Sequence, residues 1–331
     1  MNKFRLILLF VLLIGFSISA QTFFGKEPLA HTYSIVAYDP VTGDMGVAVQ
    51  SHWFSVGTVV TWGEAGVGVV ATQSLVNVSF GIRGLELLKQ GLSPQEVVDS
   101  LIKSDEGRDV RQLAVLDSKG RVASYTGLKC IKEAGNIVGE NFSVQANMML
   151  NNTVWPAMAE TYKKSTGPLA ERMLAALEAA EKEGGDIRGR QSAALVVFRG
   201  KPTGKVWEDK LVDLRVDDSP EPLVELARLL KVHRAYEHMN NGDLAIEKGD
   251  HKSALDHYGA AMQMFPENEE MKYWTAVSLA NIGKVNEALP MFKDVFHKNK
   301  NYVTLTARVF RSGLIDVPLE EYQKILMQQQ K

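Results

Sequence analysis

The fold is decided by a stretch that reads Thr32-Tyr-Ser-Ile-Val-Ala-Tyr-Asp39, then Pro40-Val-Thr-Gly43-Asp44, then Met45-Gly-Val-Ala-Val-Gln-Ser51. Two runs rich in β-branched residues flank a turn that contains proline, glycine and aspartate, and this pattern predicts a β-hairpin over residues 32–51. A hydroxyl residue, Thr32, opens the first strand. Threonine is common in strands for its shape alone, so Thr32 is either an ordinary strand residue or a functional one.

Working outward from the hairpin, the pattern alternates between sheet and helix. The predicted strands 56–62 and 65–71 are apolar on both faces, which predicts a sheet buried between layers. Ser93 and Glu96 form a capping box that opens a helix. The predicted strands are residues 56–62, 65–71, 112–117, 122–126, 142–150, 192–198 and 210–216, and the predicted helices are 81–90, 94 onward, 154–164 and 168–183. The order is sheet, two helices, sheet, two helices, sheet, which predicts an α+β layered sandwich rather than a doubly wound fold.

From Pro220 onward the sequence is helical in pattern and carries a repeat of 34 residues. The segment Gly249-Asp-His-Lys-Ser-Ala-Leu255 recurs as Gly283-Lys-Val-Asn-Glu-Ala-Leu289, and Tyr258 corresponds to Phe292. This period and pattern resemble the tetratricopeptide repeat, in which small residues let two helices approach closely. About two such units are expected in a small all-α domain over residues 220–331.

The first twenty residues have the order of a secretory signal peptide. Lys3 and Arg5 precede an apolar run over residues 6–16, and small residues follow up to Ala20. We therefore expect an exported protein, periplasmic or secreted, with residues 21–31 as a spacer before a domain over residues 32–219.

The overall composition excludes several classes of function. The formal net charge is -2, and basic residues show no aromatic interleaving, so no nucleic-acid partner is expected. The single cysteine, Cys130, cannot form an internal disulfide and is expected to pack as a small hydrophobe. The seven histidines form no ligand pair of known spacing, so neither a metal nor another cofactor is expected.

Residues 32 to about 236 resemble the bacterial family DUF1028, a domain of unknown function. The resemblance rests on Thr32-Tyr-Ser-Ile-Val-Ala, Gly43-Asp-Met-Gly-Val-Ala-Val, Ala71-Thr-Gln73, Asn77, Gly81-Ile-Arg-Gly-Leu85, Arg108-Asp-Val-Arg-Gln112, Thr126-Gly127, Cys130, Val144-Gln-Ala-Asn147, Gly185-Asp-Ile-Arg-Gly-Arg-Gln-Ser-Ala193 and Leu214-Arg-Val-Asp-Asp218. It implies a four-layer αββα fold like that of the N-terminal-nucleophile (Ntn) hydrolases. It also implies that Thr32 is the nucleophile, with its own free α-amine as the base.

The chain departs from that pattern in two ways. After removal of a signal peptide, residues 21–31 would still precede Thr32, so the implied mechanism requires a second cut between His31 and Thr32. The alternative is an intact and catalytically silent Thr32. In addition, the second hairpin strand has no acidic residue, and no lysine lies between Lys26 and Lys89 to tune the nucleophile.

Polar residues inside otherwise buried segments are the remaining site candidates. Amide side chains donate well to an oxyanion or a substrate carbonyl, and arginine binds carboxylates. These candidates are Gln73, Asn77, Gln145 and Asn147, together with Asp186, Arg188, Gln191 and Ser192 from a glycine-punctuated loop. The alternatives are that the amides satisfy buried backbone groups and that Asp186 and Arg188 brace the loop.

Two functions from different classes follow from these patterns. The first is an exported Ntn-type amidohydrolase or peptidase that cleaves an amide bond in a small peptide-like or cell-wall-derived substrate. The second is a non-catalytic ligand-binding or scaffold protein that uses the repeats to hold a protein partner. The sequence leaves a homo-oligomer open in either case.

Overall fold

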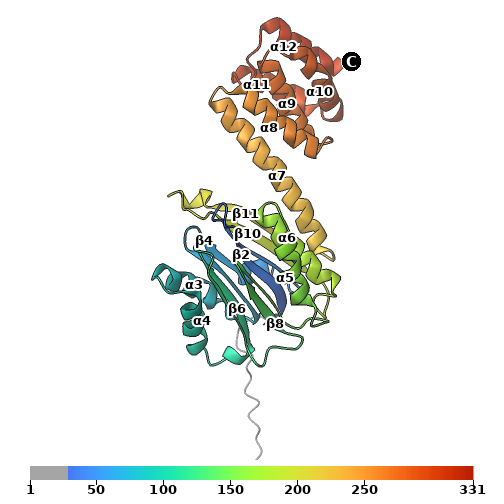
Figure 1. Cartoon of the computed structure of the whole chain (residues 1–331). Coiled ribbons are helices and arrows are strands. Elements are labelled where there is room, and N and C mark those ends of the chain that lie inside the picture. Colours follow the sequence, from blue (N-terminus) through green and yellow to red (C-terminus); the bar gives the residue numbers. More distant parts are fainter. Residues whose placement is uncertain (1–28, 331) are drawn as a thin grey trace, which may run out of the picture. The chain divides into compact units, whose positions relative to one another are not determined.

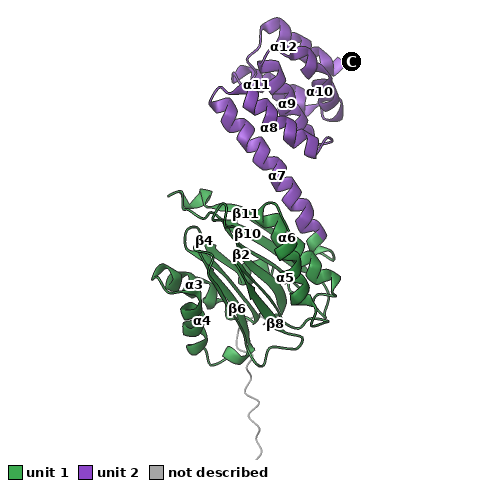
Figure 2. Ribbon diagram, in the orientation of Figure 1, with its two compact units in different colours: residues 1–223 green, residues 224–331 purple. Residues whose placement is uncertain are grey.

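The computed structural model describes residues 29–330. The chain divides into two compact units, residues 1–223 and residues 224–331, which Figure 2 shows in different colours. The predicted signal peptide and most of the predicted spacer lie outside the described residues. Each unit is described by itself below.

The first unit contains two antiparallel sheets, counted over residues 29–223. In the first sheet the order is β1 (Leu29–Ala30), β5 (Gly68–Leu75), β6 (Arg111–Asp117) and β7 (Val122–Thr126), with β4 (Thr61–Glu64) also paired to β5. In the second sheet the order is β11 (Lys210–Val216), β10 (Ser192–Phe198), β3 (Met45–Ser51), β2 (Thr32–Tyr38), β9 (Phe142–Ala146) and β8 (Gly135–Gly139).

Two pairs of helices cover the outer faces of these sheets, which gives four layers. Helices α3 (Ser79–Lys89) and α4 (Pro94–Lys103) pack against the first sheet, and α5 (Val154–Lys164) and α6 (Leu169–Lys182) pack against the second (Figure 1). The predicted capping box is confirmed, because Ser93 and Glu96 make both reciprocal hydrogen bonds at the start of α4. The α+β class is confirmed at the level of two antiparallel sheets with helices.

The predicted hairpin is confirmed as strands β2 and β3. Thr32 lies opposite Ser51 and Tyr38 lies opposite Met45. Gly43 adopts φ +81° in the turn, a conformation that glycine accepts without steric cost. The register therefore places the hydroxyl groups of Thr32 and Ser51 at the same end of the sheet.

Two predicted strands differ clearly from the structure, and strand β8 was not predicted. Residues 56–62 were expected to form one strand, but they hold the short helix α2 (Gly57–Val60) before β4, and the Thr61 hydroxyl donates to the Gly57 carbonyl across that turn at 2.7 Å. A short apolar run does not distinguish a buried helix from a strand. The strand expected over residues 142–150 ends at Ala146, because Met148 adopts φ +60°. Strand β8 was missed because its glycine-rich sequence carries little strand signal.

The layer between the two sheets is apolar along one half. Its core includes Val36 of β2, Val47 of β3, Ala71 of β5 and Leu116 of β6, all wholly buried. Side chains alternate between the two faces of a strand, so every second residue of these strands points into the layer. Burying each valine or leucine side chain contributes about 1.5–3 kcal/mol, so this half is an apolar core held by burial.

The second unit is helical over all its described residues. Its helices are α7 (Pro222–Glu247, which begins two residues before the unit), α8 (His251–Met264), α9 (Glu269–Asn281), α10 (Val285–Lys298), α11 (Asn301–Arg311) and α12 (Leu319–Leu326), followed by a short 3₁₀ turn (Met327–Gln330). The repeated positions are equivalent in α8 and α10. Ala254 and Ala288 are wholly buried, and Tyr258 and Phe292 are at most 3% exposed. Within residues 29–330, no helix combines the length and the apolar character that crossing a bilayer requires.

Candidate functional site

Thr32 lies at the point where the chain passes from one sheet to the other. Residues 29–30 pair with β5 in the first sheet, whereas β2 begins at Thr32 in the second. The Thr32 side chain is wholly buried, and its Oγ1 donates to the carbonyl oxygen of Ala30 at 2.8 Å. The peptide bond between His31 and Thr32 is thus held between the two sheets.

Two donors converge on the carbonyl oxygen of His31. Ser51 Oγ donates to it at 2.5 Å, and Arg188 Nη2 donates to it at 2.8 Å. The Ser51 hydroxyl reaches this oxygen because Ser51 lies opposite Thr32 in the hairpin register. A hydroxyl and a guanidinium on one carbonyl oxygen stabilise negative charge there, as the donors of an oxyanion hole do.

Arg188 is held in place by Asp186, two residues earlier in the same loop. Its Nη2 lies 2.7 Å from Asp186 Oδ2 and its Nε lies 3.0 Å from Oδ1. The Asp186 side chain is buried, and its Oδ2 also accepts from the backbone N–H of His52 at 3.2 Å. The pair therefore braces the loop, as one alternative expected, and at the same time aims a guanidinium at the His31 carbonyl.

The His31 imidazole is buried beside Asn147 and Arg188. Burial lowers its pKa, the charge of Arg188 lowers it further, and a hydrogen bond with Asn147 opposes that shift. His31 Nδ1 lies 2.8 Å from Asn147 Oδ1. An amide oxygen only accepts, so Nδ1 carries the imidazole proton.

The half of the inter-sheet layer next to Thr32 is a hydrogen-bonded network of amides and hydroxyls. Ser34 Oγ donates to Gln73 Oε1 and accepts from Gln145 Nε2, both at 2.6 Å. Gln112 Oε1 accepts from Gln73 Nε2 at 2.7 Å and from Asn147 Nδ2 at 2.9 Å. Gln73 Nε2 and Asn147 Nδ2 also lie 3.2 and 3.4 Å from the carbonyl oxygen of Thr32. All five of these side chains are wholly buried.

The structure brings six of the nine predicted site residues into one hydrogen-bonded cluster and leaves the side chains of three outside it. The six are Thr32, Gln73, Gln145, Asn147, Asp186 and Arg188. Asn77 instead bonds Asp105 at 3.1 Å and the first turn of α3. Gln191 bonds Asp218 at 3.1 Å, and Ser192 donates to the carbonyl oxygen of Trp53. Asn77 therefore lies apart, whereas Ser192 pairs with Ser51 in the sheet and the Gln191 backbone N–H donates to the Ser51 carbonyl at 3.1 Å, so these two border the cluster without a side-chain bond to it.

Sequence reasoning missed four members of the cluster: His31, Ser34, Ser51 and Gln112. The predicted hairpin begins at Thr32 and ends at Ser51, so the sequence already indicated that these two residues lie near each other at the open end of the hairpin. Gln112 alternates in phase with the inward-facing residues of β6, as Gln73 does in β5. Both glutamines were therefore detectable as polar residues on a buried strand face.

Two other expectations concern Cys130 and metals. Cys130 is buried, and burial raises the pKa of its thiol, which fits a packed side chain rather than a reactive thiolate. Among residues 29–330, no three His, Cys, Asp or Glu side chains form a group that could hold a metal ion.

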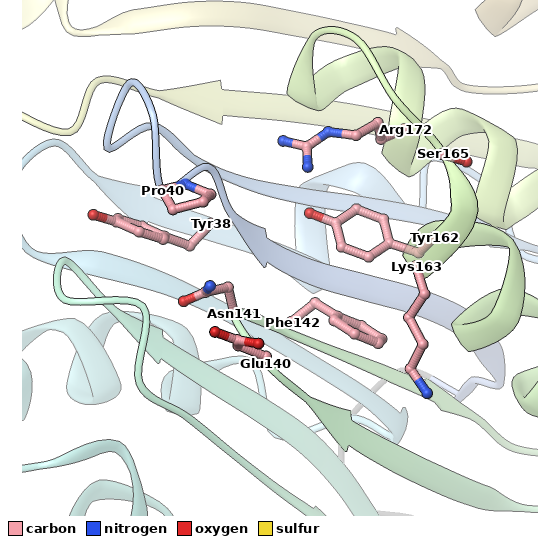
Figure 3. A pocket seen from close by; sticks show the side chains of 9 residues that line it. All are labelled: Tyr38, Pro40, Glu140, Asn141, Phe142, Tyr162, Lys163, Ser165 and Arg172. Carbon is pink, nitrogen blue, oxygen red and sulfur yellow. The ribbon is translucent and has the colours of Figure 1, made fainter.

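A cavity of about 440 Å³ opens at the other end of β2. Figure 3 shows the Arg172 guanidinium and the Tyr162 hydroxyl pointing to the same side, toward Pro40. Arg172 Nη2 pairs with Asp39 at 2.7 Å, and burial raises the pKa of Tyr162 to about 12. Thr32 lies six residues away along the strand, about 20 Å, so this cavity is separate from the cluster around Thr32. It is lined by Tyr38, Pro40, Glu140, Asn141, Phe142, Tyr162, Lys163, Ser165 and Arg172.

Comparisons with known proteins place the first unit in a family. Protein SPO2555 from Silicibacter pomeroyi, whose crystal structure is described with the same family model, shares 32% sequence identity at a TM-score of 0.55, over 61% of this chain and 88% of that one. Anbu (ancestral beta-subunit) from Yersinia bercovieri matches at 11% identity and a TM-score of 0.29, over 60% of this chain and 92% of that one, which is too low to define a common fold. No curated protein matches the chain. The family model itself covers residues 32–226, and the chain belongs to the family of unknown function DUF1028.

Proposed function

We propose that the protein is an exported Ntn-type amide hydrolase that generates its own nucleophile by cutting the peptide bond between His31 and Thr32. One observation carries the proposal: Ser51 and Arg188 both donate to the carbonyl oxygen of His31, directly before the buried hydroxyl of Thr32. An ordinary strand peptide needs no guanidinium on its carbonyl. The match to the family model also begins at Thr32.

The proposed cut takes place in two balanced steps. Thr32 Oγ1 attacks the carbonyl carbon of His31, and Ser51 and Arg188 stabilise the negative charge on the carbonyl oxygen. The C–N bond then breaks, and the hydroxyl proton ends on the Thr32 nitrogen, which leaves an ester between His31 and Thr32. Water hydrolyses this ester to a His31 carboxylate, a free Thr32 hydroxyl and a free α-amine.

The same groups would then act on a substrate. The free α-amine of Thr32 takes the hydroxyl proton as the general base, and a substrate carbonyl occupies the position of the His31 carbonyl between Ser51 and Arg188. Release of the leader also vacates the edge of β5 that residues 29–30 cover. A peptide-like substrate fits that edge because an extended backbone can replace the lost strand hydrogen bonds.

We also propose that the protein is exported and that its second unit is built from tetratricopeptide-like repeats. Export is supported by the charged and apolar order of residues 1–20, and a tetratricopeptide-like second unit by the 34-residue spacing of Ala254 and Ala288 with their buried aromatic neighbours. The location is tested by fractionating cells that produce the full chain and following it with an antibody.

The mass of the purified mature chain tests the cut. We expect a chain that begins at Thr32, and a Thr32→Ala variant that keeps the residues before it. Ser51→Ala and Arg188→Gln should each slow the cut by about 10²-fold, the usual cost of one oxyanion donor. Arg190→Gln is the matched control, because Arg190 lies in the same loop but pairs with Glu181 and Glu221.

A second candidate is supported by the enclosure of Thr32. In the uncut chain its side chain is wholly buried and its hydroxyl is engaged by the Ala30 carbonyl, as in a silent structural residue. This would make the first unit a non-catalytic binding or scaffold module that holds a partner through the helical unit. A wild-type chain that keeps residues 29–31 after prolonged incubation, with unchanged mass in all variants, would establish this candidate and refute the first.

A further inference from the structure

The helical unit contains a cavity of about 460 Å³ between helices α7, α8 and α9. It lies wholly within residues 224–331 and is independent of the cluster around Thr32. Its lining residues are Asp243, Ile246, Glu247, Tyr258, Glu270, Trp274, Val277, Ser278, Asn281 and Leu314.

The charges around this cavity are all of one sign. Asp243, Glu247 and Glu270 line it, and no lysine, arginine or histidine does. Asp243 accepts a hydrogen bond from the Tyr258 hydroxyl at 2.5 Å, and Glu270 accepts one from Tyr236 at 2.9 Å. Among the described ion pairs, none involves these three carboxylates, so no described basic residue pairs with their negative charge.

The buried part of the cavity wall offers groups that suit an organic cation. Trp274 presents an indole, and a cation near the face of an indole is attracted by the ring quadrupole. Ser278 is 1% exposed, and its hydroxyl has no hydrogen-bond partner among the described groups. An ammonium or guanidinium N–H would satisfy that oxygen, and Val277 and Ile246 supply apolar contact for an aliphatic stem.

The carboxylates do not form a metal site. No group of three acidic, histidine or cysteine side chains within residues 29–330 converges closely enough to bind a metal ion. The three carboxylates instead surround a space of about 460 Å³, which is large enough for an amino-acid side chain. Three negative charges also exceed what one ammonium neutralises, so the complementary ligand carries more than one positive charge.

We propose that this cavity binds a basic peptide segment of a partner protein, with one lysine or arginine side chain inserted beside Trp274 and neighbouring basic residues paired with the carboxylates. The segment supplies both an apolar stem and several charges, which matches the mixed lining. Binding is expected to weaken as salt screens the exposed carboxylates.

The test uses the full chain and a fluorescein-labelled, end-blocked peptide Gly-Lys-Arg-Lys-Gly, with Gly-Gln-Gln-Gln-Gly as the neutral control. Fluorescence anisotropy at low salt should detect the basic peptide only. Glu270→Gln should weaken binding about two- to fivefold, as for other exposed ion pairs, and Trp274→Leu about tenfold, as for a partly desolvated cation–π contact. Glu269→Gln, which removes the neighbouring charge in the first turn of α9, should leave binding unchanged.

A combined variant tests the same cavity if Trp274→Leu does not fold: Asp243→Asn, Glu247→Gln and Glu270→Gln. All three side chains are exposed, so this variant is expected to fold. Loss of binding in this variant supports the proposal. Equal binding of the neutral peptide, or unchanged binding in the combined variant, overturns it. Binding of free spermidine without binding of the basic peptide overturns the peptide as the occupant.

Discussion

The two halves of the layer between the sheets are built from the same strands with opposite chemistry. On β2, Ser34 and Val36 both point into the layer and lie two residues apart. On β6, Gln112 and Leu116 also point into the layer and lie four residues apart. The apolar half is held by burial, which is roughly proportional to area and indifferent to direction. The polar half is held by hydrogen bonds, which depend on the placement of each donor and acceptor. One sheet sandwich can therefore tolerate substitution at one end and depend on each donor and acceptor at the other.

The largest expected effect comes from removing the central amide of the polar half. Gln112 accepts from two amides and donates from Nε2 to Thr126 Oγ1 at 2.8 Å and to the Ala146 carbonyl at 2.9 Å. Gln112→Leu keeps most of the volume but leaves several buried groups unpaired. We expect the free energy of unfolding to fall by about 3 kcal/mol or more, measured by urea denaturation.

The matched control lies on the same face of the same strand. Leu116→Met conserves volume in the apolar half and should cost less than about 1.5 kcal/mol. Equal losses for the two variants would show that the halves do not differ in tolerance.

A smaller effect is expected from single hydroxyl groups. Ser34→Ala removes a group that donates to Gln73 and accepts from Gln145, and we expect a loss of about 2 kcal/mol of unfolding free energy. The reverse change, Val36→Thr, adds a hydroxyl that finds no partner in the apolar core and should cost about 1–3 kcal/mol. A stabilising Ser34→Ala would contradict the network, because it would mean that the hydroxyl is poorly paired. Both losses are to be measured by chemical denaturation of each variant against the parent chain.

The sequence predicted the layers better than it predicted the site. Hairpin β2–β3 follows from two runs of β-branched residues around a turn, and α4 follows from its capping box, because these signals are local. Gln73, Gln145 and Asn147 were found because polar residues are conspicuous in apolar strands. The contact of Arg188 with the His31 carbonyl joins residues 157 positions apart, so only the tertiary fold reveals it.

Asn77 was predicted from its sequence position to lie in the site, but the structure places it outside. Its position after a buried strand suggested a role beside Gln73, yet it lies beyond the end of β5 and bonds Asp105. A polar residue next to a strand can turn toward a helix end as easily as toward the layer, and the local pattern is the same in both cases.

The smallest expected effect is on the pH dependence of stability, because the polar half holds His31, whereas the buried residues of the apolar half include no histidine and no charged side chain. Burial lowers the pKa of His31 in the folded chain below its usual 6.5. Below pH 6.5 the unfolded chain therefore binds a proton that the folded chain does not, so stability falls as the pH drops toward the folded pKa. The slope is at most about 1.4 kcal/mol per pH unit, since one proton is involved.

This titration is best measured in the Thr32→Ala background, which keeps His31 attached to the chain if the proposed cut occurs. Unfolding free energies between pH 7.5 and 5 should decline less steeply in a further His31→Gln variant, whose amide can still donate to Asn147. His251→Gln, which removes a solvent-exposed imidazole at the start of α8, serves as the control for loss of a histidine outside the cluster. If His31→Gln and the parent show the same slope, His31 is not buried as a neutral ring, and the hydrogen bond that aligns it with Asn147 beside the proposed cleavage bond does not hold in solution.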